Sequence, residues 1–433
     1  MTNASAAAPA ETPAAGSRPR VVIVGAGFGG LQAAKDLAEL PVDVTVIDRR
    51  NYHLFQPLLY QVATAGLSPA DIAYPIRNIL RDQANTQVLL GRVIGVDKAA
   101  RVVHTEDRRI PYDYLIIATG ARHAYFGHDE WESAAPGLKK IEDATDIRRR
   151  ILLAFEQAET THDEAERRRL LNFVIIGGGP TGVEMAGAIA ELAHTALAED
   201  FRAINPREAR IILIEAGPRL LPALPESLSA KAKRALGRLG VEVRLATRVV
   251  RCDAAGVGIQ VNERDDRIES GCIVWAAGVA ASPAAKWLGV AGDRVGRVPV
   301  RGDLSVEHHP EIFVIGDTAL AMGKQGRPLP GIAPVAKQQG AYVARLLRLR
   351  LKGKAIAPFD YAHLGDLATI GRKAAVADFG WIRLSGSLAW FLWGAAHICF
   401  LIGFRNRLAV LLNWLWAYLS FHRGSRLITG TMT

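Results

Sequence analysis

Cysteine is scarce in this chain, which has Cys252, Cys272 and Cys399 among its 433 residues. None of the three lies in a Cys-x-x-Cys motif or at metal-ligand spacing from another. Their scarcity excludes a disulfide scaffold, a cysteine-rich zinc site and a vicinal redox dithiol, and it indicates a reducing compartment. The pair His308-His309 has no further ligands nearby, so we expect a turn there and no metal site.

The amino-terminal segment lacks the charged and apolar regions of a signal peptide. Residues 1–19 are rich in alanine, proline and threonine, and they predict a disordered leader. The whole chain has 53 basic and 43 acidic residues, a net charge of +10. That excess suits nucleic acid, an anionic cofactor or a membrane surface, and the absence of a basic, aromatic-interleaved motif argues against nucleic acid.

A strand, a glycine turn and a helix occur in succession near the start of the chain. The buried strand Val21–Val24 runs into the G-x-G-x-x-G turn Gly25–Gly30, and the next strand ends in Asp48. The three glycines allow a tight turn, close approach of a pyrophosphate and close helix–strand packing. The phosphates bind the N–H groups at the start of the helix, and Asp48 accepts hydrogen bonds from ribose hydroxyls. The strand and small-residue turn Asp113–Gly120 close this copy.

The same succession returns later in the chain. The strand Phe173–Ile176 runs into Gly177–Gly182, an acid-tipped strand ends at Glu215, and Cys272–Gly278 closes the second copy. An acid at this tip repels a 2′-phosphate, which favours NADH over NADPH, while Arg219 nearby leaves NADPH open. Two such sites in one chain imply two bound dinucleotides.

Between and after the copies the pattern is helical and less specific. The charged stretch Lys139–Leu171 predicts a solvated linker helix. Further on, Glu311–Asp317 predicts a strand that meets a Gly-Asp turn, followed by a helix around Val335–Leu351.

The carboxyl-terminal segment differs in composition from the rest. Residues 383–433 include five arginines and no lysine, aspartate or glutamate, so they carry +5, half of the net charge. The apolar run Leu384–Phe404 is long enough to span a bilayer, whereas Leu408–Phe421 is too short. We favour an interfacial helical hairpin with arginines at the lipid headgroups. A single spanning helix and a hairpin buried in a dimer or in the core remain alternatives.

The order of these motifs over residues 20–350 resembles the two-dinucleotide-binding-domain flavoproteins. That resemblance implies FAD in the first site and NADH in the second. The lack of a cysteine pair excludes the disulfide reductases and disfavours sulfide:quinone reductases. What remains resembles the type II NADH dehydrogenases, on the stretches Asn51–Leu59, Gly179–Glu184, Trp275–Val279 and Ile332–Gly340.

The resemblance implies an α/β fold with two tandem Rossmann-like domains and a C-terminal amphipathic helical membrane anchor. The expected parts are a leader at 1–19, an FAD-binding domain at 20–138 and 297–350, an NADH-binding domain at 139–296 that includes the linker helix, and a C-terminal region at 351–433 with membrane-associating helices at 384–422. The implied FAD contacts are Gly25, Gly27, Phe28, Gly29, Gly30, Asp48, Arg49, Thr119, Gly120, Gly316 and Asp317. The implied NADH contacts are Gly177, Gly179, Thr181, Gly182, Glu184, Glu215, Ala277 and Gly278.

Three residues are candidates for the chemistry. Glu184 corresponds to a family acid near nicotinamide and flavin that handles protons, and a helix-start acid stabilised by the dipole is the alternative. The family's A-Q-x-A-x-Q quinone motif has Pro334 in place of its first glutamine, so only Gln338 aligns with a quinone-contacting amide. Proline is tolerated in the first turn of a helix. Lys373 resembles a lysine at the quinone tunnel, or is a solvated surface lysine.

The implied activity is non-electrogenic NADH:quinone oxidoreduction, with a hydride passing from NADH to FAD and two electrons to a membrane quinone. The family resemblance also implies a monotopic enzyme, which we expect on the cytoplasmic face of the cell membrane. The charge of the tail indicates an anionic lipid surface, and a homodimer is left open. Two alternatives are an NADH-dependent reductase of a ferredoxin-type carrier and a non-enzymatic NADH-responsive flavoprotein.

Overall fold

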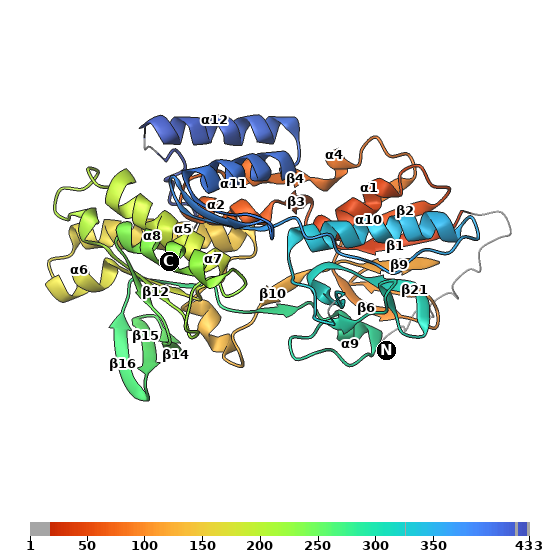
Figure 1. The fold of residues 1–433 in the computed structure, drawn as a ribbon, viewed down its shortest axis with the longest axis horizontal. Helices are drawn as coiled ribbons and strands as arrows, with labels where there is room; N and C mark the ends of the chain where they lie inside the picture. The colour runs from red at the N-terminus through yellow and green to blue at the C-terminus, as the bar shows by residue number, and fades with distance from the viewer. Residues whose placement is uncertain (1–17, 325, 421–422, 431–433) are drawn as a thin grey trace, which may run out of the picture. The chain divides into compact units, whose positions relative to one another are not determined.

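The computed structural model describes residues 18–324, 326–420 and 423–430. The chain forms two compact units, each built around its own parallel sheet (Figure 1). Of the described residues, unit 1 comprises those up to His53, Tyr74–Arg122 and Val279–Ala362, and unit 2 comprises Leu54–Ala73, His123–Gly278 and those from His363 onward. Most of the predicted leader, residues 1–17, and the end of the predicted helical region, residues 421–422, lie outside the described residues.

The sheet of unit 1 has six strands in the order β20-β21-β9-β1-β2-β5. All neighbours pair in parallel except β20 with β21. The central strand β1 is buried from Val21 to Val24, the continuous apolar run that a parallel sheet covered on both faces requires. The strands are β1 (Arg20–Val24), β2 (Asp43–Asp48), β5 (Thr86–Leu90), β9 (Tyr114–Ile117), β20 (Ser305–Val306) and β21 (His309–Val314).

Shorter elements complete unit 1 and its borders. They are the antiparallel sheet β6 (Val93–Asp97), β7 (Val102–Thr105) and β8 (Arg109–Pro111), the pairs β3 (Tyr52–Leu54) with β4 (Ala73–Pro75), β10 (Ala121–His123) with β18 (Val279–Ala281) and β19 (Val298–Pro299) with β22 (Ala319–Leu320), and the helices α1 (Phe28–Asp36), α4 (Ile76–Ile79), α9 (Ala284–Leu288) and α10 (Ala333–Arg350).

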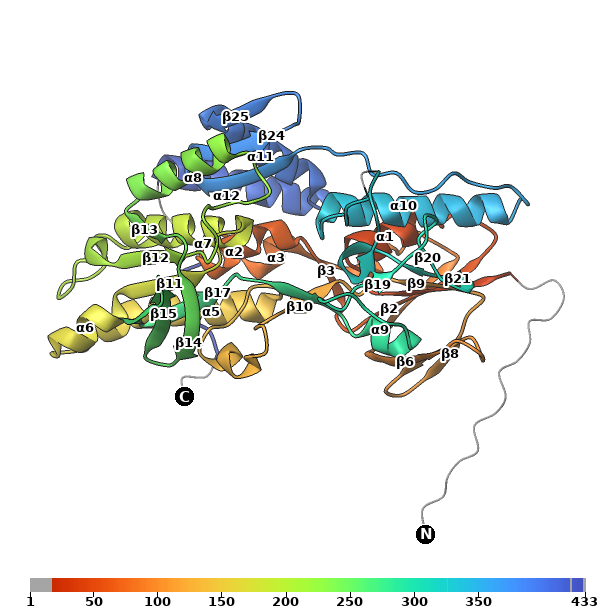
Figure 2. The same cartoon turned by 60° about the horizontal axis from the view of Figure 1, so that its bottom comes forward.

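Helices α1 and α10 lie side by side in unit 1 (Figures 1 and 2). Their backbones meet at Gly340, where an added Cβ would lie 2.2 Å from the carbonyl oxygen of Gly29. Helix α10 has Pro334 in its first turn, which confirms that the proline does not prevent the helix. The close approach of Gly29 and Gly340 therefore holds α1 directly against α10.

The sheet of unit 2 has the order β13-β12-β11-β17, and all of its neighbours are parallel. The strands are β11 (Asn172–Ile176), β12 (Arg210–Ile214), β13 (Val241–Arg244) and β17 (Cys272–Trp275), and an antiparallel sheet follows with β14 (Arg248–Asp253), β15 (Gly256–Val261) and β16 (Arg264–Glu269). Its main helices are α2 (Leu59–Ala63), α3 (Pro69–Ile72), α5 (Ile141–Thr160), α6 (Glu164–Leu170), α7 (Pro180–Glu191) and α8 (Glu226–Arg238).

The prediction of a solvated linker helix after Lys139 is wrong for α5. One face of this helix is buried in unit 2 and includes Ile147, Ile151 and Phe155. Arg148 is 5% exposed and donates a hydrogen bond to the hydroxyl of Thr429. The arginine triplet suggested an all-polar surface, but the apolar residues recur at helical spacing on the opposite side.

The expected domain boundaries and the compact units differ in four segments, one of which is 351–362, expected in the C-terminal region but part of unit 1. Leu54–Ala73 belongs to unit 2 because α2 packs against α5 and α7. Residues from His123 also belong to unit 2, while Val279–Gly296 belongs to unit 1.

A three-stranded antiparallel sheet and two helices form the end of the chain. They are β23 (Asp366–Gly371), β24 (Ala374–Asp378), β25 (Arg383–Gly386), α11 (Ser387–Phe400) and α12 (Phe404–Ser420). The first residues of the apolar run from Leu384 thus form a strand, because β25 pairs with β24. Among the described residues, no helix combines the length and the apolar character needed to cross a bilayer.

Replacing Gly340 by alanine tests the contact between α1 and α10. Because the new methyl group overlaps the Gly29 carbonyl, we expect Gly340→Ala to lower the free energy of unfolding by about 1–3 kcal/mol. Gly237→Ala on α8 is the matched control, since a Cβ there meets no atom within 4 Å, and we expect it to stabilise by roughly 0.5–1 kcal/mol. Urea unfolding of both variants checks this, and equal midpoints would contradict the packing.

Candidate functional site

The first glycine turn lies at the carboxyl end of β1 and leads into α1. A Cβ on Gly25 would lie 2.4 Å from the carbonyl oxygen of Ala118, and a Cβ on Gly30 would lie 1.9 Å from that of Gly25. At Gly27 an added Cβ would meet no atom within 4 Å. The turn is thus closed toward the protein and open at its second glycine, and α1 begins there without a side-chain cap. This arrangement fits the pyrophosphate of a dinucleotide at the helix start.

The second glycine turn has the same geometry in unit 2. A Cβ on Gly177 would lie 2.7 Å from the carbonyl oxygen of Ala276, one on Gly182 would lie 1.8 Å from that of Gly177, and one on Gly179 would meet nothing within 4 Å. Helix α7 also begins without a side-chain cap, and Pro180 occupies its first turn. Because proline has no N–H, this helix start offers one donor fewer than the first.

A carboxylate at the tip of the second strand fastens each turn. Asp48 accepts the N–H of Ala26 at 2.7 Å and that of Arg50 at 2.8 Å. Glu215 accepts the N–H of Gly178 and that of Gly217, both at 2.6 Å. Each carboxylate oxygen has a further lone pair for a ribose hydroxyl.

Charges around the two acids differ. Burial raises the pKa of Asp48, while the two backbone N–H groups and the nearby Arg49 and Arg50 lower it. Arg219, the residue that left NADPH open, donates its guanidinium to the carbonyl of Pro222 at 2.9 Å.

The Gly-Asp turn of unit 1 is held by groups that the sequence reasoning missed. Gly316 has a φ of 69° and donates its N–H to the side chain of Gln339 at 2.6 Å. Thr318 donates to the carbonyl of Gly120 at 3.1 Å, and the hydroxyls of Thr119 and Ser282 lie 2.5 Å apart. Thr119, Gly120 and Gly316 therefore lie together, as their expected role at FAD requires.

The neighbouring glutamines of α10 have different roles. Gln339 is 1% exposed and supports the Gly316 turn. Gln338 is half-buried; its amide nitrogen donates to the carbonyl of Ala362 at 2.8 Å, and its oxygen accepts the N–H of Ala362 at 2.9 Å. The helical spacing is the signal that could have revealed this difference, since Gln339 lies one turn from the buried residues Val335 and Val343. The amide of Gln338 keeps one N–H donor and one oxygen lone pair, which are available to hydrogen-bond an electron acceptor such as a quinone.

Glu184 lies in the first half of α7 and packs toward β23. Burial raises its pKa to about 8, and a hydrogen bond from the backbone N–H of Thr369 opposes that rise. Tyr60 on α2 is buried nearby, and its pKa is raised by burial and by the charge of Glu184. At neutral pH this arrangement holds Glu184 protonated, so the acid has a proton to give.

Lys373 lies at the turn between β23 and β24. Its ammonium group lies 5.2 Å above the ring of Tyr418 on α12, and the residue is exposed with a φ of 60°. The backbone N–H of the preceding residue, Arg372, is bonded to Glu191, which lies about two turns along α7 from Glu184. Lys373 and Glu184 thus lie on the same unit at different ends of α7, and Gln338 belongs to unit 1.

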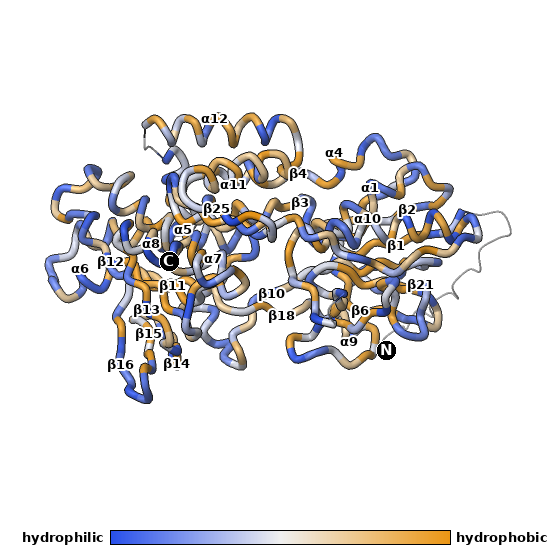
Figure 3. Tube along the Cα trace, in the orientation of Figure 1, coloured by the Kyte–Doolittle hydropathy of each residue, from blue (hydrophilic) through white to orange (hydrophobic). Residues whose placement is uncertain are grey.

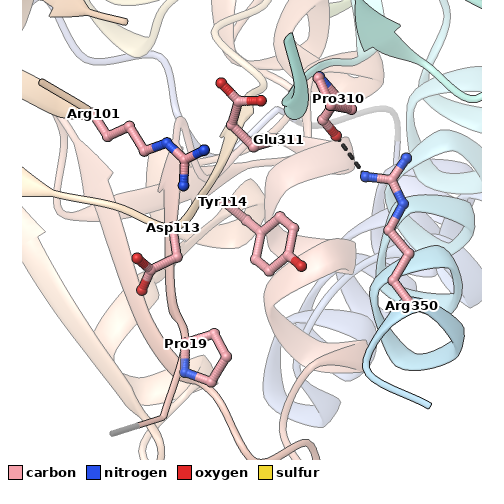
Figure 4. A pocket seen from close by; sticks show the side chains of 7 residues that line it. All are labelled: Pro19, Arg101, Asp113, Tyr114, Pro310, Glu311 and Arg350. Carbon is pink, nitrogen blue, oxygen red and sulfur yellow. Dashed lines mark hydrogen bonds between the residues drawn. The ribbon is translucent and has the colours of Figure 1, made fainter. Parts of the chain in front are cut away.

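A hollow of about 420 Å³ lies at the amino edge of the unit 1 sheet (Figure 4). Asp113 and Arg350 line it, and both charges are already paired, with Arg20 and Asp303 respectively. It lies at the opposite edge from the first glycine turn and takes no part in the candidate site. No group of three or more metal-ligating side chains occurs among the described residues.

Two glycine turns with acid-tipped strands, each on its own parallel sheet, define a flavoprotein with two dinucleotide-binding domains. In agreement, residues 19–340 match the pyridine nucleotide-disulphide oxidoreductase family and residues 363–423 match the NDH2 C-terminal domain. The type II NADH:quinone oxidoreductase NdhA of Mycobacterium tuberculosis is 46% identical over 98% of this chain and 92% of its own length. A Staphylococcus haemolyticus type II enzyme is 29% identical over 87% of this chain and 93% of its own length.

This chain therefore belongs to the type II NADH:quinone oxidoreductase family. Among solved structures, NDH2 of Plasmodium falciparum in complex with NADH has the same fold, with a TM-score of 0.87 and 22% identity. The match covers 95% of this chain and all of that one. The resemblance predicted from the motifs and the predicted α/β fold are confirmed.

The pH dependence of stability tests the burial of Glu184. Its folded-state pKa of about 8 exceeds the ordinary value of 4.5, so the wild-type protein loses stability as pH rises from about 4.5 to about 8 and changes no further above that. Glu184→Gln lacks this titration. We expect the melting temperature of the variant to rise relative to that of the wild type as the pH increases over this range. Calorimetry from pH 5 to 9 measures the difference. A difference that does not vary with pH would show that the carboxyl group is ionised throughout.

Proposed function

We propose that the enzyme works at a membrane surface, where it passes electrons from NADH through FAD to a quinone dissolved in the bilayer. The observation that carries the proposal is the pair of carboxylate-fastened glycine turns, together with a carboxyl-terminal hairpin whose outer face is apolar. The reaction class is that of the family to which the chain belongs. Bound FAD supplies hydride acceptance at N5 and two-electron delivery to the acceptor.

The chain's own groups bind and orient the two dinucleotides. In unit 1, Gly27 leaves room for the FAD pyrophosphate, and Asp48 and Thr119 offer hydrogen-bonding groups to its sugar portions. In unit 2, Gly179 leaves room for the NADH pyrophosphate and Glu215 takes the adenosine ribose. The remaining expected FAD contacts lie in unit 1, and the remaining expected NADH contacts lie in unit 2.

Glu184, Gln338 and Lys373 serve the acceptor and its protons in this proposal. Reduction of a quinone to the quinol consumes two protons, and Glu184 carries one at neutral pH. The free N–H of the Gln338 amide can donate to a quinone carbonyl in place of the hydrogen bond that Pro334 cannot make. The Lys373 ammonium, held over the Tyr418 ring, supplies positive charge for a reduced, anionic oxygen.

Helix α12 is amphipathic with its apolar side outward. Its exposed residues recur at the spacing of one helix face, namely Leu408, Leu411, Leu412, Leu415, Trp416 and Leu419, and each is at least 45% exposed. The inner side has the buried residues Asn406 and Val410. Figure 3 shows apolar residues along both α11 and α12. A row of exposed leucines and a tryptophan suits the apolar part of a lipid leaflet.

The inner side of the hairpin is fastened to unit 2. Asn406 donates to the carbonyls of Ala70 and Ala73 at 3.3 and 3.2 Å. Trp414 donates its indole N–H to Gln61 at 2.8 Å, and its ring stacks 5.4 Å from that of Trp393. A fixed hairpin presents the outer face as one surface.

The predicted role of the tail arginines at lipid headgroups is wrong for two of them. Arg423 is half-buried and pairs with Glu191 at 3.2 Å, and Arg426 pairs with Asp200. The exposed Arg405 and Arg407 at the start of α12 remain as headgroup contacts. The proposal therefore rests more on the apolar face than on net charge. The cytoplasmic side is supported by the three free thiols, which suit a reducing compartment.

Vesicle binding tests the apolar face. We expect the double variant Leu412→Glu with Trp416→Glu to partition into phosphatidylglycerol-containing vesicles at least about tenfold less than the wild type, since each buried apolar side chain contributes roughly 1.5–3 kcal/mol. Leu364→Glu, exposed outside the hairpin, is the matched control and should partition normally. If the double variant instead converts a dimer to a monomer in detergent, the face is an interface between copies and the membrane assignment is wrong.

Separate half-reactions test the acceptor residue. We expect Gln338→Ala to leave NADH-driven flavin bleaching unchanged in stopped flow and to slow reoxidation by a ubiquinone or menaquinone analogue about tenfold or more, the effect of one lost hydrogen bond to the reacting group. Gln339→Ala should instead loosen FAD, because it leaves the Gly316 N–H unpaired. Unchanged quinone kinetics in Gln338→Ala would remove this residue from the acceptor site. A wild-type enzyme that NADH does not reduce would remove the function itself.

A further inference from the structure

A cluster of aromatic side chains covers the carboxyl end of β17 in unit 2. The indole of Trp275 donates to the carbonyl of Ala124 at 3.0 Å, and its ring lies 5.0 Å from that of Tyr125 and 5.7 Å from that of Trp131. These three aromatic residues are at most 7% exposed. Their packing fastens the loop that contains them to the strand.

Phe126 belongs to this cluster but is not buried by it. Its ring lies 6.1 Å from that of Trp275, yet the residue is 69% exposed. Its backbone has a φ of 55°, a left-handed conformation that is strained for a bulky side chain. Packing within the cluster does not account for an exposed phenyl ring on a strained backbone, and strain of this kind concentrates where ligands are held.

The exposed ring lies directly on Gly278. A Cβ added to this glycine would lie 2.4 Å from Cζ of Phe126, and Gly278 has a φ of 82°. The carbonyl of Gly278 also accepts the N–H of Ala124 at 3.4 Å. Only a glycine leaves room for the ring here, so the loop of Phe126 and the loop after β17 form one surface.

Sheet topology assigns this surface to one half of the second dinucleotide. In the order β13-β12-β11-β17 the direction of strand succession reverses between β11 and β17, where a dinucleotide crosses the carboxyl edge. Glu215 at the tip of β12 takes the adenosine half. The other half therefore passes over the end of β17, at Ala276–Gly278, beside the exposed ring.

We propose that the phenyl ring of Phe126, held over Gly278 by a left-handed backbone, is the surface against which the nicotinamide end of NADH is seated. The ring is flat, apolar and already fixed in place, so the nicotinamide buries it on binding. The substituent at this position then sets affinity for the nicotinamide half and leaves the adenosine half unaffected. This inference rests on the NADH site proposed above.

Binding of two related ligands to the FAD-loaded enzyme tests the inference. ADP-ribose has the adenosine half without nicotinamide, and NAD⁺ has both. We expect Phe126→Ala to weaken NAD⁺ about tenfold, in the range of one aromatic contact, and to leave ADP-ribose unchanged, both measured by calorimetric titration. Phe126→Tyr should restore the wild-type ratio of the two affinities. Trp381→Ala, which removes an aromatic residue that is 84% exposed elsewhere in unit 2, is the matched control.

A readout of orientation accompanies the binding data. At saturating NADH we expect flavin reduction in Phe126→Ala to be slower than in the wild type, because the nicotinamide is less well fixed. Equal NAD⁺ to ADP-ribose affinity ratios in Phe126→Ala and the wild type would overturn the role of Phe126 while leaving the proposed function intact. Failure of the wild-type enzyme to bind NAD⁺ or ADP-ribose at all would instead overturn the NADH site of unit 2.

Discussion

The candidate site depends on one repeated interaction, the bond between a carboxylate at a strand tip and the backbone N–H of a glycine turn. Asp48 and Glu215 each bridge the turn before them and the loop after them, at 2.6 to 2.8 Å. The turn needs its first and last glycines because a side chain at either position would strike the neighbouring backbone. It needs the acid because glycine alone does not fix the conformation of the turn. Each pair therefore prepares an open helix start before any dinucleotide arrives.

The carboxyl-terminal part of the chain changes the chemistry of unit 2 as well as its surface. The sheet β23–β25 packs along α7, so close that a Cβ on Gly187 would lie 1.6 Å from the carbonyl oxygen of Ile370. Glu184 lies on the same helix, where burial raises its pKa to about 8 and the backbone N–H of Thr369 in β23 opposes that rise. The pKa of this acid therefore depends in part on a segment outside the dinucleotide motif.

The fold was largely predictable from the sequence, and the detailed contacts were not. The glycine spacing and the apolar strand that precedes it lie within a few consecutive residues. The sequence therefore predicts β1, β11 and their turns at the residues where the structure has them. The bond from Gly316 to Gln339 joins parts of the chain that only tertiary packing brings together. For α5 the apolar stripe was present in the sequence, but the charges of Arg148–Arg150 obscured it.

Charge and apolarity at the end of the chain show why composition does not determine location. Arg423 and Arg426 raise the net charge of the tail, yet each pairs with an acid of unit 2. The inner side of α12 carries Asn406, whose amide nitrogen donates to two backbone carbonyls, while the leucines of the helix lie outside. In water such a helix would turn its apolar side inward, because exposed leucines cost free energy. The hydrogen bonds of Asn406 and Trp414 instead hold the leucines outward, which agrees with the proposed contact of this face with the apolar part of a lipid layer.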